Sequence, residues 1–236
     1  MAGKIATIAF IAFMVATSIY VWVIDPWMRR RAVSTEAARL GLRFEARLGG
    51  TAAAAPGYLR RGFRDRICNV VLGERGALSF ARYDYARRKF GADWLVVLLP
   101  DVAVPAFRVF RRDSADTWRL AYELSTVTAN GRALAPVELD DQPSFAARYR
   151  LVSDNPEAIA AVFRAGFAAA IAPHTDMTVE GESGSLWIRC PPEGQPSLGE
   201  QVELGVQLAE ALRHSAAIAG LHSDGRRNER RPNERG

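Results

Sequence analysis

The sequence predicts an α+β fold: a single N-terminal transmembrane helix followed by a largely antiparallel sheet domain with two helices in its C-terminal half. Three observations predict it. Residues 5–24 carry no charge, several short strand patterns separated by turn signals fill residues 42–139, and two helix-start signals follow at Asn155 and Ser197. We therefore divide the chain into an anchor with a basic flank (1–31), an α+β domain (32–221) and a disordered basic tail (222–236).

The uncharged segment is predicted to cross a bilayer once. About 20 helical residues span a hydrocarbon core of roughly 30 Å. Tyr20, Trp22 and Trp27 gather at one end, where aromatic rings prefer the headgroup layer. A cleaved signal peptide is the alternative, but the small residues at Ala16 and Ser18 are followed by further apolar sequence. A buried helix of a water-soluble protein usually keeps one polar face, which this segment lacks.

The flanking charges predict the orientation. Only Lys4 precedes the apolar segment, whereas Arg29, Arg30 and Arg31 follow it directly. Basic residues resist translocation, so we expect the N-terminus outside and the large domain in the cytoplasm.

The elements of the first half follow from alternation and turn residues. Residues 27–40 are predicted to form a helix that Gly41 ends, and residues 73–76 mark a hairpin. Tight connections favour an antiparallel meander. The predicted strands are 42–48, 67–72, 78–85, 93–99, 106–110, 118–124 and 133–139.

The second half is predicted to contain a strand, a helix, a hairpin and a second helix, in that order. A strand at 145–152 precedes a helix that starts with Asn155 and Pro156 and runs to about Ala172. Strands at 177–182 and 185–190 form a hairpin. Ser197 and Glu200 make a capping box that opens a helix to about Ala217.

The sequence contains segments that partly match catalytic motifs, but none of these motifs is complete. Residues 181–185 (GESGS) lack the last glycine of a nucleophile elbow and lie between two strands. His174 with Asp176, or the pair Asp140 and Asp141, could serve a hydrolase, although both sets also suit polar loops. The histidines and the two cysteines, Cys68 and Cys190, share no ligand spacing. We expect no catalytic residue, cofactor or metal ion, two inert thiols, and a protein that is not an enzyme.

The net charge of +5 is carried almost wholly by arginine. Arginine clusters can attract anionic lipid headgroups or an acidic partner, or they can be a solvated face. Nucleic acid is not an expected partner, because no recognition helix or stacking motif accompanies the clusters. The clusters are residues 60–66, 87–89 and 108–112.

Residues 69–73 (NVVLG), 82–85 (RYDY) and 145–151 (FAARYRL) resemble motifs of a broad group of uncharacterised bacterial single-span membrane proteins. The likeness covers most of the predicted domain, although the connection at 86–92 is shorter than in that group. The group has no assigned activity, so the resemblance implies the fold and the anchor only. From the anchor and its flanking charges we expect a location in the bacterial inner membrane.

These observations predict a non-enzymatic accessory or structural subunit of a larger membrane assembly for energy transduction, transport or envelope function. The transmembrane helix would contact an integral membrane partner, since small side chains allow close helix approach. The alternative is a membrane-surface module that binds anionic lipid headgroups or a small ligand. The predicted contact residues are Ala9, Ala12, Ala16, Tyr20, Trp22, Trp27, Arg29, Arg30 and Arg31.

Overall fold

The computed structural model describes residues 2–47, 67–85, 92–112, 133–175, 177–182, 184–190 and 196–221. Its centre is one nine-stranded sheet in the order β1-β2-β3-β4-β9-β8-β5-β7-β6, in which every pairing is antiparallel. The strands are β1 (Arg43–Arg47), β2 (Ile67–Arg75), β3 (Leu78–Tyr85), β4 (Ala92–Leu98), β5 (Phe107–Arg111), β6 (Ala135–Val137), β7 (Tyr149–Ser153), β8 (Thr178–Glu182) and β9 (Ser185–Cys190).

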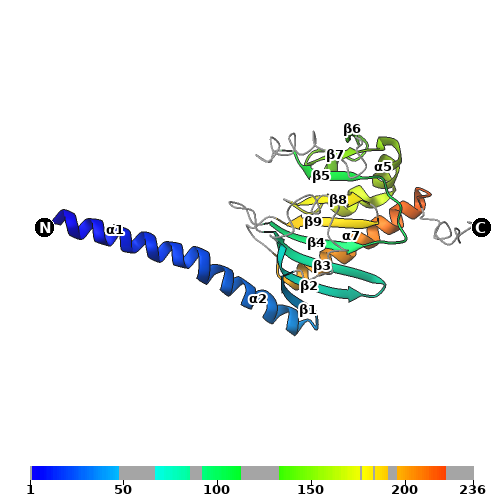
Figure 1. Cartoon of the computed structure of the whole chain (residues 1–236). Coiled ribbons are helices and arrows are strands. Elements are labelled where there is room, and N and C mark those ends of the chain that lie inside the picture. Colours follow the sequence, from blue (N-terminus) through cyan, green and yellow to red (C-terminus); the bar gives the residue numbers. More distant parts are fainter. Residues whose placement is uncertain are drawn as a thin grey trace, which may run out of the picture.

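The sheet is not a simple meander. β1 to β4 follow one another, but the β8–β9 hairpin is inserted between β4 and β5. Asp93 on β4 therefore pairs with Cys190 on β9, nearly one hundred residues later. Figure 1 shows the strands stacked side by side from β1 at one end to β6 at the other.

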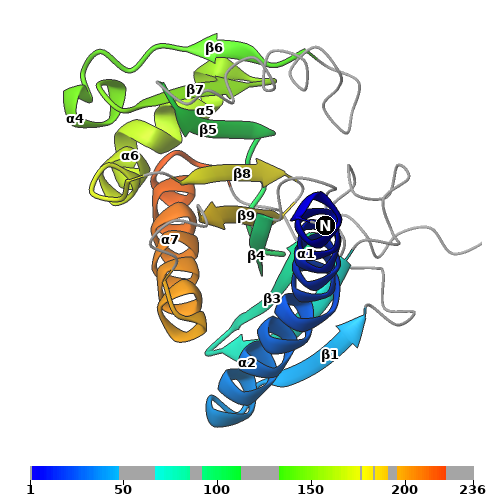
Figure 2. The same cartoon turned by 90° about the vertical axis from the view of Figure 1, so that its left-hand side faces the viewer.

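The C-terminal helices pack on one face of the sheet. They are α4 (Pro143–Ala146), α5 (Pro156–Val162), η4 (Phe163–Phe167), α6 (Ala168–Ile171) and α7 (Leu198–Ile218). Figure 2 shows α6 and α7 on the same side of the strands. The core between these layers contains a cluster of edge-to-face rings. Phe107 of β5 lies 5.5 Å from Phe163 and 6.0 Å from Phe167, measured between ring centroids.

Local signals explain the ends of these helices. The Ser197 hydroxyl accepts from the Glu200 backbone N–H, and the Glu200 carboxylate accepts from the Ser197 N–H, so the predicted capping box is confirmed. Asn155 caps α5 through Ala158 N–H. The predicted single helix of residues 155–172 is interrupted by the π-helical η4, where Gly166 has a φ of +132°.

Two sequence predictions about strands are wrong in detail. Residues 145–152 do not form one strand, because Pro143 starts the short helix α4 and β7 begins only at Tyr149. The hairpin turn lies later than expected, because β2 continues to Arg75, which pairs with Leu78 across Gly76. The predicted strand at 118–124 and the tail at 222–236 lie outside the described residues.

The predicted fold class is wrong because of its N-terminal span. The uncharged segment is divided between α1 (Ala2–Ile19) and the π-helical η1 (Tyr20–Ile24), which α2 (Asp25–Arg39) follows. The 18 residues of α1 include Lys4 near their start, and 18 residues rise only about 27 Å. Within the part of the chain that the structure describes, none of the helices combines the length and apolarity needed to cross a membrane.

Candidate functional site: the N-terminal helix and its ionic attachment

The N-terminal helical segment extends away from the sheet (Figure 1). Many of its large apolar side chains are exposed. Phe13 is 67% exposed and Val23 is 60% exposed. Contiguous apolar patches of this kind mark interaction surfaces. The exposed apolar residues of α1 and η1 are Phe10, Ile11, Phe13, Met14, Val15, Ile19, Tyr20, Val23 and Ile24, and we call them the apolar helix surface.

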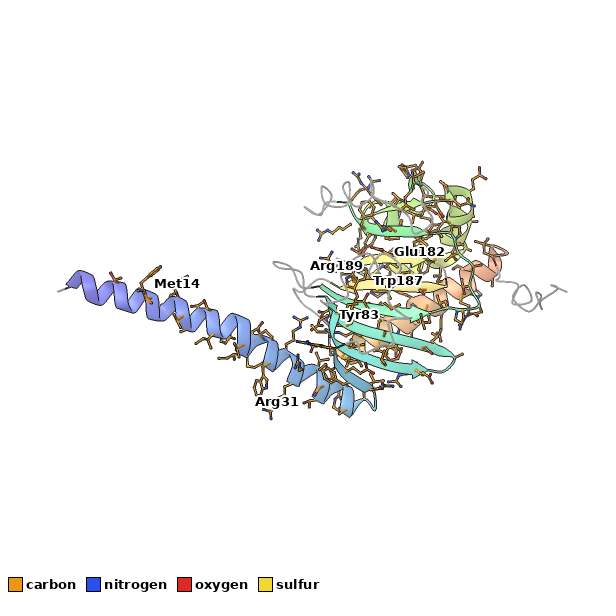
Figure 3. All side chains as sticks on the ribbon, in the orientation of Figure 1. Met14, Arg31, Tyr83, Glu182, Trp187 and Arg189 are labelled. Atoms are coloured by element: carbon orange, nitrogen blue, oxygen red, sulfur yellow. The ribbon has the colours of Figure 1, made fainter. Side chains whose placement is uncertain are left out.

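A second exposed feature continues this surface along α2. The guanidinium carbon of Arg31 lies 5.5 Å from the ring centroid of Trp27, within the range of a cation–π contact. Figure 3 shows Arg31 and Met14 on the extended helix, apart from the labelled residues of the sheet. Beside Trp27 and Arg31 runs an open groove of about 530 Å³, also lined by Met28, Ala32, Thr35, Glu36 and Arg39.

All six predicted contact residues with described side chains are exposed: Ala16, Tyr20, Trp27, Arg29, Arg30 and Arg31. The side chains of Ala9, Ala12 and Trp22 lie outside the described part of the structure. Arg29 is different, because its side chain turns toward the sheet. The nine residues therefore do not form one uniform surface.

Arg29 binds two carboxylates, one near the end of β3 and one near the start of β4. Its Nε donates to Asp84 Oδ2 of β3 at 2.9 Å, and its Nη2 pairs with Asp93 Oδ1 of β4. A second guanidinium completes the group, since Arg82 lies 2.5 Å from Asp84 and 2.6 Å from Asp93. Two positive and two negative charges balance. We call Arg29, Arg82, Asp84 and Asp93 the ionic cluster.

The strand register places this cluster. Asp84 and Asp93 are directly paired across β3 and β4, so their carboxylates share one face of the sheet and repel each other unless cations lie between them. The pairing of β2 with β3 has an irregular register between Cys68 and Val71, and Asn69 adopts a φ of +52° there. Asparagine tolerates this left-handed conformation. Its side-chain amide donates to Asp84 Oδ2 at 2.7 Å.

Burial makes the cluster electrostatically strong. The side chains of Arg82 and Asp93 are 5% and 3% exposed, whereas that of Arg29 is 43% exposed. Burial raises the pKa of Asp93, and Arg82 opposes this shift. Burial lowers the pKa of Arg29, but Asp84 and Asp93 outweigh it, so the net pKa is raised. The Arg29 guanidinium therefore stays charged and holds both carboxylates.

Apolar packing supports the same attachment. Ala37 of α2 is fully buried in the main core, and Val33 and Leu40 pack against that core from the same side. Gly41, with a φ of +68°, ends the helix and turns the chain into β1. The ionic cluster and this packing together fix the direction in which the helix leaves the sheet.

The groups considered for catalysis do not assemble. Asp141 pairs with Arg164 at 3.1 Å, and Asp176 lies outside the described residues. The backbone carbonyl of His174 accepts from the Tyr149 hydroxyl at 2.5 Å, and burial lowers the pKa of the His174 imidazole. Gly181 and Glu182 are the last residues of β8, and Ser185 is the first residue of β9. Burial, with a smaller contribution from Asp84, raises the pKa of the Cys68 thiol.

Possible metal ligands are scattered in the same way. Across residues 2–47, 67–85 and the later described segments, no three His, Cys, Asp or Glu side chains are grouped as a metal ion would require.

The sequence analysis missed the ionic cluster. A signal was present, because Phe80, Arg82 and Asp84 alternate along one strand and so share a face. Phe80 belongs to the main core, which means that the two charged residues also point toward the core side. Charged residues on the inner face of a strand are rare unless they are paired. Their partner on α2 could not be identified from that alternation.

Comparisons with known proteins show a shared fold. No family model and no curated protein matches the chain. Among solved structures, the chain is similar to the crystal structure of the mycobacterial trehalose monomycolate transport factor A, TtfA, with a TM-score of 0.52 and 13% sequence identity. The match covers 80% of this chain and 93% of that chain. The likeness is one of fold.

Proposed function

We propose that this protein is a non-enzymatic accessory subunit of a transport assembly. It would dock through the apolar helix surface onto apolar helices of an integral membrane protein. The observation that carries the proposal is an exposed apolar helix whose base is held to the sheet by a buried ionic cluster.

The composition of the helix favours a protein partner. Exposed aromatic and aliphatic side chains lie beside the small residue Ala16. Small residues allow two helices to approach closely, and large apolar residues fill the grooves beside them. Tyr20 and Trp27 can bury most of their rings while their polar atoms keep a hydrogen bond at the rim of the contact. Arg30 and Arg31 would then lie at the polar margin.

The ionic cluster suits an accessory role because it fixes the helix relative to the domain. A docking helix on a loose linker holds its domain nearby but in no set direction. Here Arg29 contacts two strands at once, so a partner that binds α1 also orients β3 and β4. Preorganisation of this kind lowers the entropy cost of assembly.

Transport is favoured over the other assemblies by the fold comparison. The similar structure is named a transport factor for trehalose monomycolate. That name describes the other protein, and at 13% identity the cargo is not carried over. An accessory role in a transport assembly is consistent with both the fold and the exposed apolar helix surface.

Purification from membranes in a mild detergent, followed by mass spectrometry, tests the proposal. We expect a stoichiometric integral membrane protein with the full chain. The same partner should be lost from a Phe13→Glu, Val23→Glu variant, because charges on the apolar helix surface cannot be buried against apolar helices. Glu203→Gln on α7 is a matched surface control. Recovery of a lone monomer, or retention of the partner by the double variant, would contradict the proposal. Association of the wild type with protein-free liposomes alone would show that the bilayer is the occupant.

A further inference from the structure

Four arginines lie where β5 ends and β7 begins, in the part of the sheet far from α2. Arg111 pairs with Tyr149 across the two strands, and Phe110 pairs with Arg150. The Arg112 backbone N–H donates to the Arg148 carbonyl at 2.9 Å and extends the pairing by one step. The strand ends thus bring together Arg111, Arg112, Arg148 and Arg150.

These side chains line a cavity of about 610 Å³, which we call the arginine cavity. Its other described walls are Ala147, Tyr149 and Thr175, and none of the described lining residues is acidic. Within the described part of the chain, Arg112 and Arg150 have no carboxylate partner, and Arg148 donates to the Ala172 carbonyl at 3.0 Å. An anion would supply the charge partner that Arg112 and Arg150 lack among the described residues.

An apolar cavity of about 390 Å³ adjoins the arginine cavity. Arg112, Tyr149 and Arg150 line both cavities, so the two share a wall. Among the described residues that line the apolar cavity, one is acidic, Glu138. Its apolar walls come from β5, β6, the segment after β6, α4 and β7, and they include Phe110, Val137, Leu139, Phe145, Leu151 and Val152.

The two cavities have the chemistry of the two ends of an amphiphile. Guanidiniums form paired hydrogen bonds to phosphate or carboxylate oxygens, and the second cavity offers aliphatic and aromatic walls to an alkyl chain. Both volumes lie in the range of about 300–1,000 Å³ typical of small-molecule sites. Tyr149 stands at the boundary, with its ring buried and its hydroxyl bound to His174 O.

We propose that the arginine cavity and the apolar cavity together bind one anionic amphiphile. The phosphate or carboxylate head lies against Arg112, Arg148 and Arg150, and the alkyl chain enters the apolar cavity. This inference goes beyond the proposed docking function, and it does not depend on it, because β1, β2 and α2 lie at the other end of the sheet.

Native mass spectrometry of the full chain in a neutral detergent tests this site. The probes are hexadecyl phosphate, inorganic phosphate and hexadecanol. We expect one hexadecyl phosphate per chain, binding at least about tenfold more tightly than either of the other probes, since each lacks one half of the recognition. Shortening the alkyl chain should weaken binding step by step.

Arg150→Gln should weaken binding of hexadecyl phosphate by about ten- to a hundredfold, the loss expected for one charged hydrogen-bonding group. Arg150 is exposed, so the variant should fold, which circular dichroism verifies. Arg75→Gln, which removes one equally exposed charge at the far end of the sheet, should leave binding unchanged. Equal losses in both variants would overturn the proposal.

A last arm distinguishes the source of the ligand. Vesicles that contain phosphatidic acid are mixed with the protein and then removed by centrifugation. Transfer of one lipid to the protein indicates a ligand drawn from a bilayer, whereas binding of free hexadecyl phosphate alone indicates a soluble amphiphile. The site would be refuted if hexadecanol or inorganic phosphate bound as tightly as hexadecyl phosphate.

Discussion

Replacing Arg29 with alanine removes the member of the ionic cluster that the N-terminal helical segment supplies. The remaining Arg82 then faces both Asp84 and Asp93, which leaves one negative charge uncompensated. Because Asp93 is only 3% exposed, water reaches that charge poorly. The variant should therefore lose stability, although no core volume is removed.

The magnitude follows from the geometry. Arg29 makes two hydrogen bonds to ionised groups, and such bonds contribute about 1.5–3 kcal/mol each. Its side chain is 43% exposed, so solvent recovers part of this energy when the contacts are lost. We expect a loss of about 2 kcal/mol in the free energy of unfolding. With a urea m-value of about 2 kcal/mol/M, the unfolding midpoint falls by about 1 M.

Urea titration of the full chain in a mild detergent, followed by far-UV circular dichroism, measures this loss. Arg30→Ala is the matched control, since Arg30 is exposed on the next position of α2 and should change stability by less than about 0.5 kcal/mol. Arg29→Lys should recover only part of the loss, because one ammonium group cannot reproduce the fork that reaches both carboxylates. Equal midpoints for Arg29→Ala and Arg30→Ala would refute the role of the cluster.

Three further substitutions test the packing and the N-terminal cap of α7. In Gly181→Ala, the new Cβ would lie 2.1 Å from Phe107 Cε1 in a filled ring cluster, so stability should fall by about 1–3 kcal/mol in the same urea titration. Gly199→Ala on α7, with its nearest neighbour at 3.8 Å, should instead be neutral or stabilising by up to about 1 kcal/mol, and a loss there would contradict the packing argument. Ser197→Ala should cost about 1 kcal/mol by removing an N-cap. Hydrogen bonds from the Ser197 N–H and hydroxyl lower the pKa of Glu200. The stabilisation from these two bonds to the Glu200 carboxylate is therefore present above pH 4.5 and is lost as pH falls through the lowered pKa. The difference between wild type and Ser197→Ala in thermal unfolding should therefore shrink below pH 4.5, and a constant difference would exclude the Glu200 half of the capping box.

Local patterns in the sequence predicted many elements to within a few residues. A continuous apolar run placed β4, alternation placed β5, and the Ser197–Glu200 spacing placed the start of α7, because each depends on residues close together in the chain. Alternation failed at Phe145, where Pro143 starts a helical turn that keeps the ring buried. The pairing of β4 with β9 depends on packing between distant segments, which short-range patterns do not encode.

The same limit applies to the candidate site. Hydropathy identified the apolar segment but treated residues 5–24 as one helix, whereas α1 ends at Ile19 and a π-helical segment follows. Tyr20, Trp27 and Arg31 are exposed, whereas Arg29, which was predicted to contact the same partner, binds the sheet. Its partners Asp84 and Asp93 lie 55 and 64 residues away, and only the β3–β4 register brings them together.

Photo-crosslinking from the helix tests the central claim most directly. A photoreactive residue at Phe13, in the middle of the apolar helix surface, should form a cross-link to one integral membrane protein in intact membranes. The same residue at Glu203 on α7 should not form that cross-link. In the Arg29→Ala background, the Phe13 cross-link should persist, while cross-links from β3 to the same partner should weaken, because the helix no longer sets the direction of the domain. A Phe13 probe that labels only lipid, or that labels many proteins equally, would contradict a docking role for this helix.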